Sequence, residues 1–225
     1  MLTAIIVAAG SSRRVGFDKL FAPAAGKPVI EHTVDAFEGT KSVSEILVVT
    51  RGDRVAEFEK LLSRKKKVRQ VIAGGEHRQD SVRAGLESLG DETKYVAVHD
   101  GARPLTTPEQ IERVFAQARE HGAAALAEPV IDTLKRVDAM LSVIGSLDRD
   151  GVYAMQTPQI FARDLLEEAY RVVFTKGLRI TDEVSAVEQL GRKVVLVPAD
   201  DVNFKITYER DLRIAEFILQ TRGRR

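Results

Sequence analysis

The sequence AIIVAAGSSRRVGFDKLF, residues 4–21, joins a short apolar run to a glycine and then to three basic side chains. The apolar run predicts a buried strand. Gly10 follows it, and a glycine there lets backbone N–H groups approach an anion without a Cβ in the way. Arg13, Arg14 and Lys19 then supply guanidinium and ammonium groups, which suit a polyphosphate. The segment therefore predicts a strand that ends at a phosphate-binding loop.

Two common phosphate motifs are absent from this segment. The chain has no G-x-x-x-x-G-K-[ST] sequence, and residues 10–16 do not match G-x-G-x-x-G. An ordinary P-loop enzyme and an NAD dehydrogenase are therefore both excluded. Taken alone, the segment also allows a plainer interpretation, in which Gly10 only turns the chain and the basic residues are solvated.

Apolar runs of strand length alternate with stretches of helical spacing along the chain. Thr107, Pro108 and Gln110 predict the start of one helix, because threonine can cap it, proline suits its first turn and glutamine completes a capping box. This alternation predicts an α/β fold, a Rossmann-like and mostly parallel sheet flanked by helices on both faces. Ligands of such sheets bind at the carboxyl ends of the strands. The predicted strands are residues 4–8, 46–50, 68–73, 95–99 and 194–197.

The sequence pattern changes over residues 133–161. Apolar and polar residues alternate there, a turn signal stands at Asp150-Gly151, and apolar residues at helical spacing are absent. We expect a single domain over residues 1–225, with a projecting β-arm at about 133–156. Apolar residues without a local core favour a surface for another chain; a hairpin folded back on its own domain is the alternative. These residues are Leu134, Val137, Leu141, Val143 and Ile144.

The composition limits the kind of partner. The 225 residues hold 34 basic and 33 acidic side chains, a formal charge of +1, so no global field would attract nucleic acid or a membrane surface. Cysteine is absent, which excludes disulfides, thiolate metal ligands and cysteine nucleophiles. With no apolar run of spanning length and no export signal, we expect a cytoplasmic protein without a membrane segment.

Polar residues follow two more predicted strands. In VHDGARP, Asp100 can hold Mg²⁺ or a ribose hydroxyl and Arg103 can face a phosphate, although an aspartate that stabilises a turn is the alternative. In AGGEHRQDSV, two glycines permit close backbone approach and Ser81 is a donor for a base, whereas His77 has no partner at metal-ligand spacing.

Two late segments add weaker signals. ITDE places Thr181 at a predicted helix start, and VNFKIT places Lys205 on a predicted short strand. Because cations outnumber nucleophiles wherever the chain converges, the pattern favours phosphoryl chemistry by positioning and charge stabilisation.

These blocks together resemble the 2-C-methyl-D-erythritol 4-phosphate cytidylyltransferase family. AAGSSRR with Lys19, GGEHRQDSV, VHDGARP, DTLKR, DRDGVYAMQTPQIF, ITDE and NFKIT occur in the family's order and span nearly the whole chain. The resemblance implies transfer of the cytidylyl group of CTP to methylerythritol phosphate, with release of pyrophosphate and no covalent enzyme intermediate. It departs at Asp18 and Leu20, which flank Lys19 where family members commonly carry proline and glutamine.

The resemblance also implies residue roles and partners. Catalytic roles fall on Arg14, Lys19 and Lys205, with Mg²⁺ near Asp100 bridging phosphates. The residues expected to bind cytidine and its ribose are Ala8, Ala9, Gly10, Gly75, Glu76, Ser81, Asp100 and Gly101. The residues expected to bind the polyol phosphate are Arg103, Thr133, Arg149, Thr157 and Thr181. Thr133 and Arg149 lie on the arm, which in the family clasps a second subunit, so the resemblance implies a homodimer.

Two other functions fit the same residues. A ribitol 5-phosphate cytidylyltransferase would share the scaffold and differ only in the polyol pocket. A non-catalytic module that senses CTP would use the same cradle and would not need Lys19.

Overall fold

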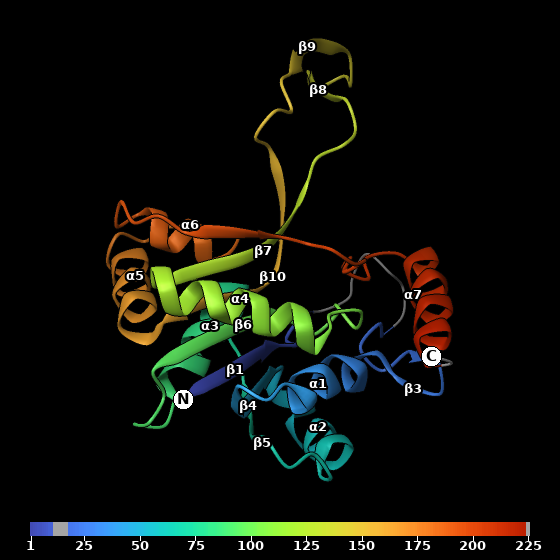
Figure 1. Cartoon of the computed structure of the whole chain (residues 1–225), viewed down its shortest axis with the longest axis vertical. Coiled ribbons are helices and arrows are strands. Elements are labelled where there is room, and N and C mark those ends of the chain that lie inside the picture. The colour runs from blue at the N-terminus through green and yellow to red at the C-terminus, as the bar shows by residue number, and fades with distance from the viewer. Residues whose placement is uncertain (11–17, 224–225) are drawn as a thin grey trace.

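The central element of the fold is a sheet of seven strands in the order β11-β7-β10-β6-β1-β4-β5 (Figure 1). The computed structural model describes residues 1–10 and 18–223. All neighbouring strands run parallel except β10, which is antiparallel to both β6 and β7, so the predicted mostly parallel sheet is confirmed. The strands are β1 (Leu2–Val7), β4 (Val43–Thr50), β5 (Val68–Ala73), β6 (Tyr95–Asp100), β7 (Ala123–Pro129), β10 (Tyr153–Ala162) and β11 (Val195–Pro198).

Helices cover both faces of the sheet, because side chains of each strand alternate between two apolar clusters. Along β1, Ala4 and Ile6 face one cluster and Ile5 faces the other, and all three are fully buried. The first cluster packs against α1 (Val29–Gly39), α2 (Val55–Leu62) and α4 (Pro108–His121). The second packs against α3 (Arg78–Glu87), α5 (Arg163–Thr175) and α6 (Glu183–Glu188).

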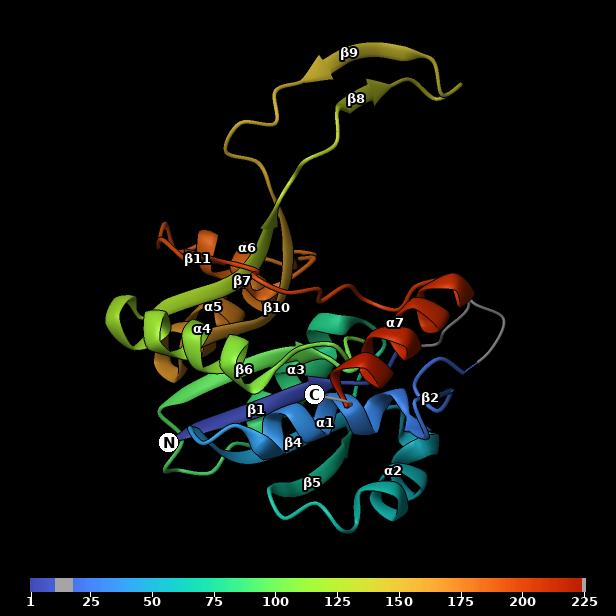
Figure 2. The same ribbon diagram turned by 45° about the vertical axis from the view of Figure 1, so that its right-hand side comes forward.

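A smaller apolar cluster joins the two ends of the chain. Helix α7 (Glu209–Arg222) packs there beside the short strands β2 (Pro23–Ala24) and β3 (Lys27–Pro28), through Ala215, Ala24 and Ile206. A 3₁₀ turn, Gly52–Arg54, precedes α2. Strand β2 is therefore held against α7, near the C-terminal end of the chain (Figure 2).

The predicted start of α4 is confirmed. Thr107 Oγ1 accepts a hydrogen bond from Gln110 N at 3.3 Å, and the Gln110 side chain accepts one from Thr107 N at 3.3 Å. The helix ends at Gly122, whose φ of +84° is the left-handed conformation that glycine adopts without a Cβ clash. Local sequence thus determines both ends of this helix.

The sequence pattern missed two strands of the sheet. β7 reads AAALAEP, and alanine has little intrinsic preference for strands, so its burial against neighbours decides its conformation. The predicted arm, at about residues 133–156, overlaps the start of β10, which lies between β6 and β7 in the sheet and is buried over residues 156–161.

The predicted arm is present and shorter than expected. Strands β8 (Leu134–Val137) and β9 (Val143–Leu147) form a separate two-stranded sheet that projects from the body (Figures 1 and 2). Residues from Tyr153 onward belong to β10, since Tyr153 pairs with Pro129 of β7. The side chains near the hairpin tip are open to solvent, with Met140 86% and Leu141 80% exposed.

No helix in residues 1–10 and 18–223 is long and apolar enough to cross a membrane.

Gly85 lies where α3 crosses β1 and leaves no room for a larger residue. A Cβ built on Gly85 would lie 2.7 Å from Ile5 Cγ2, and Ile5 is fully buried. We predict that Gly85→Ala lowers the free energy of unfolding by about 1–3 kcal/mol, because overpacking outweighs the gain in helix propensity of about 1 kcal/mol. Urea unfolding measures the difference.

Gly39→Ala in α1 is the matched control. A Cβ there would meet only Pro108 Cγ, at 3.7 Å, an ordinary contact. We expect this variant to be at least as stable as the parent. Equal stability of the two alanine variants would contradict the packing argument.

Candidate active site

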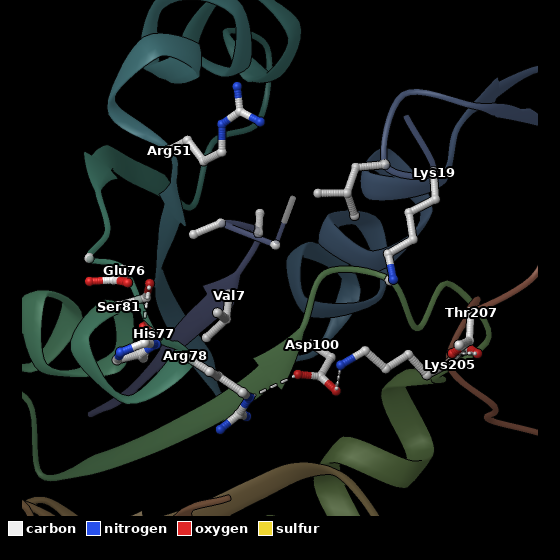
Figure 3. Close-up of a pocket in the computed structure, with 16 residues that line it drawn as sticks. Val7, Lys19, Arg51, Glu76, His77, Arg78, Ser81, Asp100, Lys205 and Thr207 are labelled. Atoms are coloured by element: carbon white, nitrogen blue, oxygen red, sulfur yellow. Dashed lines mark hydrogen bonds and ion pairs between the residues drawn. The ribbon is translucent and has the colours of Figure 1, made fainter. Parts of the chain in front are cut away.

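A pocket of about 960 Å³ opens at the carboxyl ends of β1, β4, β5 and β6. This is the edge of the sheet at which ligands of parallel α/β folds bind. The loops after these four strands form one side, and segments near Lys19 and Lys205 form the other (Figure 3). The lining residues are Val7, Ala8, Ala9, Gly10, Lys19, Leu20, Arg51, Gly75, Glu76, His77, Arg78, Ser81, Asp100, Ala102, Lys205 and Thr207.

Asp100, the last residue of β6, holds three cations around its carboxylate. Arg78 Nε donates to Oδ1 at 3.2 Å and Lys205 Nζ donates to Oδ2 at 3.0 Å (Figure 3). Arg103 Nε lies 3.5 Å from Oδ2 without making a hydrogen bond in the described structure. Residues from α3, the loop after β6 and the C-terminal segment are thus joined at one carboxylate.

The charges on this cluster fix its protonation. Burial alone would raise the pKa of Asp100, but Lys205, Arg78 and Arg103 outweigh it and hold that pKa far below its usual range. The carboxylate therefore stays ionised at every pH at which the protein works. Burial lowers the pKa of Arg103, and the charge of Asp100 opposes that effect.

Arg78 is held from its other side by Glu183 at the start of α6. Its two terminal nitrogens donate to the two oxygens of Glu183 at 2.6 and 3.0 Å, and Glu183 is fully buried. Tyr170 also donates to Glu183, at 2.9 Å. Burial alone would lower the pKa of Arg78, but the negative charges of Glu183 and Asp100 outweigh burial and raise that pKa above its usual value. The guanidinium therefore joins two carboxylates and fixes the start of α3 against α6.

Two lysines from opposite ends of the chain stand together on one side of the pocket (Figure 3). Ile206 is fully buried and its N–H donates to Ala102 O at 2.8 Å, so Lys205 beside it faces the pocket. Lys19 Nζ donates to Ile206 O at 3.0 Å. Two ammonium groups separated by most of the sequence thus lie against one short segment.

A chain of neutral groups supports Asp100 from below. Asp100 N donates to Thr157 Oγ1 at 3.1 Å, and Thr157 Oγ1 lies 3.0 Å from His99 Nδ1. His99 Nε2 faces Arg103 O at 3.4 Å, so Nε2 carries the proton and Nδ1 accepts from the threonine. Burial lowers the pKa of His99 to about 3, with Asp100 opposing and Arg103 adding to the effect. The imidazole is neutral.

Glycines on the pocket edge allow close packing within the protein. A Cβ on Gly75 would lie 2.3 Å from Asp80 Cβ, and a Cβ on Gly74 would lie 2.5 Å from Ser81 Oγ. A Cβ on Gly101 would lie 3.0 Å from Ile30 Cδ1. Gly74 and Gly75 thus bring the loop after β5 against α3, and Gly75 remains on the pocket surface.

The structure brings together most of the residues expected from the sequence. Arg14 lies outside the described residues. Nine others line the pocket: Ala8, Ala9, Gly10, Lys19, Gly75, Glu76, Ser81, Asp100 and Lys205.

Six expected residues do not line the pocket. Gly101 is buried, with its N–H bonded to Val7 O, and Arg103, whose side chain is 11% exposed, donates to Asn203 O at 2.7 Å. Thr157 lies beneath Asp100. Thr181 is exposed before α6, and Thr133 and Arg149 are exposed on the arm, where Arg149 donates to Ile131 O.

One local prediction was wrong. Lys205 lies on a segment without strand pairing: the side chain of Asn203 donates to Thr157 O at 2.8 Å, and Ile206 N donates to Ala102 O in the loop after β6. The helix start predicted at Thr181 is present two residues later, where α6 begins at Glu183 after the cap Asp182, whose carboxylate accepts from Ser185 N at 3.0 Å.

Sequence reasoning missed Arg78, Glu183, Arg51 and Thr207. Arg78 stands in the motif GGEHRQDSV and Glu183 in the motif ITDE. In the sequence, however, each looks like an ordinary charged residue exposed to solvent at the start of a helix. Arg51 follows β4 directly, at the edge where ligands bind, and that position was the available signal. Thr207 lines the pocket two residues after Lys205.

The residues present do not fit a magnesium ion on Asp100. Both carboxylate oxygens already face cations, and the described residues contain no group of three or more acidic or histidine side chains that could hold a metal. Mg²⁺ in proteins takes one or two carboxylates that are free to bind it, with water and substrate phosphates.

The fold and the site define a nucleotidyltransferase. A Rossmann-like sheet presents glycine-containing loops and converging cations at its carboxyl edge. Residues 2–221 match the sequence profile of the family described as IspD, 2-C-methyl-D-erythritol 4-phosphate cytidylyltransferase. The chain belongs to this family and is a cytidylyltransferase.

Relatives agree over nearly the full length. The 2-C-methyl-D-erythritol 4-phosphate cytidylyltransferase of Desulforamulus reducens is 39% identical over 99% of this chain and 97% of its own. That of Bacillus licheniformis is 40% identical over 98% of this chain and 96% of its own. The crystal structure of 4-diphosphocytidyl-2C-methyl-D-erythritol synthase from Anaerococcus prevotii has a TM-score of 0.86 at 30% identity and covers 98% of both chains.

The low pKa of His99 predicts a loss of stability in mild acid. The unfolded chain binds a proton near pH 6.5 and the folded one only near pH 3, so stability falls as pH drops below about 6.5. The slope from this group is about 1.4 kcal/mol per pH unit. Urea unfolding of wild type and His99→Asn at pH 7 and pH 5 should show a smaller loss in the variant, and equal losses would contradict the argument.

Proposed function

We propose that this chain transfers the cytidylyl group of CTP to 2-C-methyl-D-erythritol 4-phosphate, giving 4-diphosphocytidyl-2-C-methyl-D-erythritol and pyrophosphate. A phosphate oxygen of the acceptor attacks the α-phosphorus of CTP, and the bond to the bridging oxygen of the leaving pyrophosphate breaks. The observation that carries the proposal is that Lys19 and Lys205, distant in sequence, stand together on one side of a pocket built at the carboxyl ends of four strands.

The nucleotide side of the pocket is the edge after β1 and β5. Backbone from Ala8 to Gly10 and the Gly75–Glu76 pair line this side, where main-chain groups can meet a base. Ser81 is almost fully buried and its hydroxyl donates to His77 O at 3.3 Å. Because the family transfers a cytidylyl group, we expect the base held here to be cytosine. Asp100 at the neighbouring strand end then lies at the level of the ribose and the phosphates.

The cations stabilise the charge that develops on the reacting phosphate. Lys19 and Lys205 stand on the same side of the pocket, and their ammonium groups donate to Ile206 O and to the Asp100 carboxylate. Phosphate oxygens carry more charge than a carbonyl, so bound CTP competes for the ammonium group of Lys19. Preorganised cations of this kind supply most of the catalysis in phosphoryl transfer. Arg14 is expected to join them.

The acceptor side involves the arm. Thr133 and Arg149 are too exposed in a single chain to form a binding site by themselves. The apolar side chains of the arm, with Leu141 80% and Val143 63% exposed, favour burial against a second copy. We therefore propose a homodimer in which each arm brings Arg149 to the pocket of its neighbour. Arg103 and Thr157 support Asp100, and Thr181 lies two residues before Glu183, the partner of Arg78.

The magnesium ion implied by the family resemblance stays a prediction. Its ligands would be triphosphate oxygens and water, because the carboxylate of Asp100 is already neutralised.

Pyrophosphate release from CTP tests the function. We expect turnover with methylerythritol phosphate, little with ribitol 5-phosphate and none without an acceptor. Lys19→Ala should lower kcat by about a hundredfold or more, as loss of a transition-state donor does. Lys41→Ala, an exposed lysine outside the pocket, is the control.

Each alternative has its own outcome in this assay. Faster turnover with ribitol 5-phosphate would identify the sister activity. CTP binding without pyrophosphate release, for any acceptor, would indicate a sensor. Full activity of Lys19→Ala would overturn the proposed mechanism.

Arg149→Ala tests the role of the arm. We expect the acceptor KM to rise about tenfold or more, because a hydrogen bond to a charged group contributes about 1.5–3 kcal/mol, and the KM for CTP to stay within about twofold. Lys135→Ala is the matched control, since Lys135 is an arm cation bonded across the hairpin to Ser146 Oγ at 2.7 Å. Equal changes in both KM values would contradict the assignment.

A further inference from the structure

Lys19 is flanked by two anchors of different kinds. On one side, Leu20 is almost fully buried, and its carbonyl accepts from Ile30 N at 3.0 Å. On the other side, Asp18 forms an ion pair with Arg54, a residue at the start of α2. Leu20 belongs to the core of the fold. The pair between Asp18 and Arg54 is specific to this loop and has no role in the reaction as described so far.

The carboxylate of Asp18 has two separate partners. Oδ2 takes the guanidinium of Arg54, and Oδ1 accepts from Leu20 N at 3.2 Å. The carbonyl of Asp18 accepts from Ala22 N at 2.9 Å. One aspartate therefore fixes the backbone on both sides of Lys19 and ties it to α2.

Arg54 is itself held in place by aromatic rings. Its guanidinium carbon lies 4.3 Å from the centre of the Phe21 ring and 5.6 Å from that of Phe58, and these two rings meet edge to face at 5.0 Å. Phe58 is fully buried. A planar guanidinium that stacks on an aromatic ring keeps its direction, which lysine would not do. Arg54 thus differs from an ordinary surface cation.

We infer that Asp18 and Arg54 are positioning residues that set the place of the Lys19 ammonium group in the pocket. The inference rests on the proposed role of Lys19. A long lysine side chain reaches Ile206 O only when its backbone is fixed, and a displacement of about 1 Å at a reacting centre can cost up to a hundredfold in rate. The pair therefore acts on turnover through Lys19.

The test compares two acids that bind the same guanidinium. Asp18→Asn removes the charge that ties the loop and keeps the side-chain shape. Glu57→Gln removes the other acid on Arg54. Glu57 accepts from Arg54 Nε at 2.7 Å and belongs to α2, not to the segment that carries Lys19. We expect Asp18→Asn to lower kcat about tenfold with both KM values within about twofold, and Glu57→Gln to leave kcat unchanged. Thermal midpoints of both variants are measured alongside, and Arg54→Gln should reproduce the effect of Asp18→Asn.

A double-variant cycle shows whether the effect passes through Lys19. In a Lys19→Ala background, Asp18→Asn should cause no further loss of kcat, because residues that act as a unit are not additive. The inference would be overturned if Asp18→Asn lowered kcat by the same factor in the Lys19→Ala background as in the wild type. Equal kcat values for Asp18→Asn and Glu57→Gln would also overturn it. Wild-type kcat in Lys19→Ala would instead reject the proposed role of Lys19, a result distinct from either of these.

Discussion

The carboxylate of Asp100 is the interaction on which the site depends. It lies at the end of the middle strand of the sheet and draws cations from three separate parts of the chain. Without a negative charge at that point, Arg78, Arg103 and Lys205 would repel one another in a partly buried space. With it, they can stand close together before any substrate arrives, and the cost of gathering them is met during folding.

The balance of charge around Asp100 leaves the pocket positive. Among the residues that the structure describes, four cations line the pocket, Lys19, Arg51, Arg78 and Lys205, against two carboxylates, Glu76 and Asp100, so two positive charges are in excess. The whole chain carries only +1. A local excess in a nearly neutral protein attracts a small polyanion to one place without binding polyanions over the rest of the surface. The neutral imidazole of His99 fits this balance, since a protonated ring there would add a further buried charge.

The sequence predicted the parts of the site that depend on strand ends. Ala8 to Gly10 and Asp100 follow apolar runs that predict strands. Because parallel strands bring their carboxyl ends to one edge of the sheet, the apolar pattern and the sheet topology are enough to place these residues together. The sequence could not say which way a side chain points. Arg103 and Thr157 stand in the quoted motifs, but their side chains turn toward Asn203 and His99, beneath the pocket. Arg78 and Glu183 were missed because a buried ion pair between two helix starts is a tertiary contact, and neither residue has a local pattern that indicates it.

The pocket and the arm differ in what holds them in place. Ala8 after β1 and Ala102 after β6 belong to the buried core, and buried Ile206 anchors Lys205 in the same way, so these parts of the nucleotide side are held within one chain. The arm joins the body at β7 and β10, and its tip exposes apolar side chains. Residues on the arm therefore take their position from whatever buries that surface. In the proposed homodimer the apolar contact between subunits would set the place of Arg149. Recognition of the acceptor would then depend on assembly, while the gathering of cations around Asp100 would not.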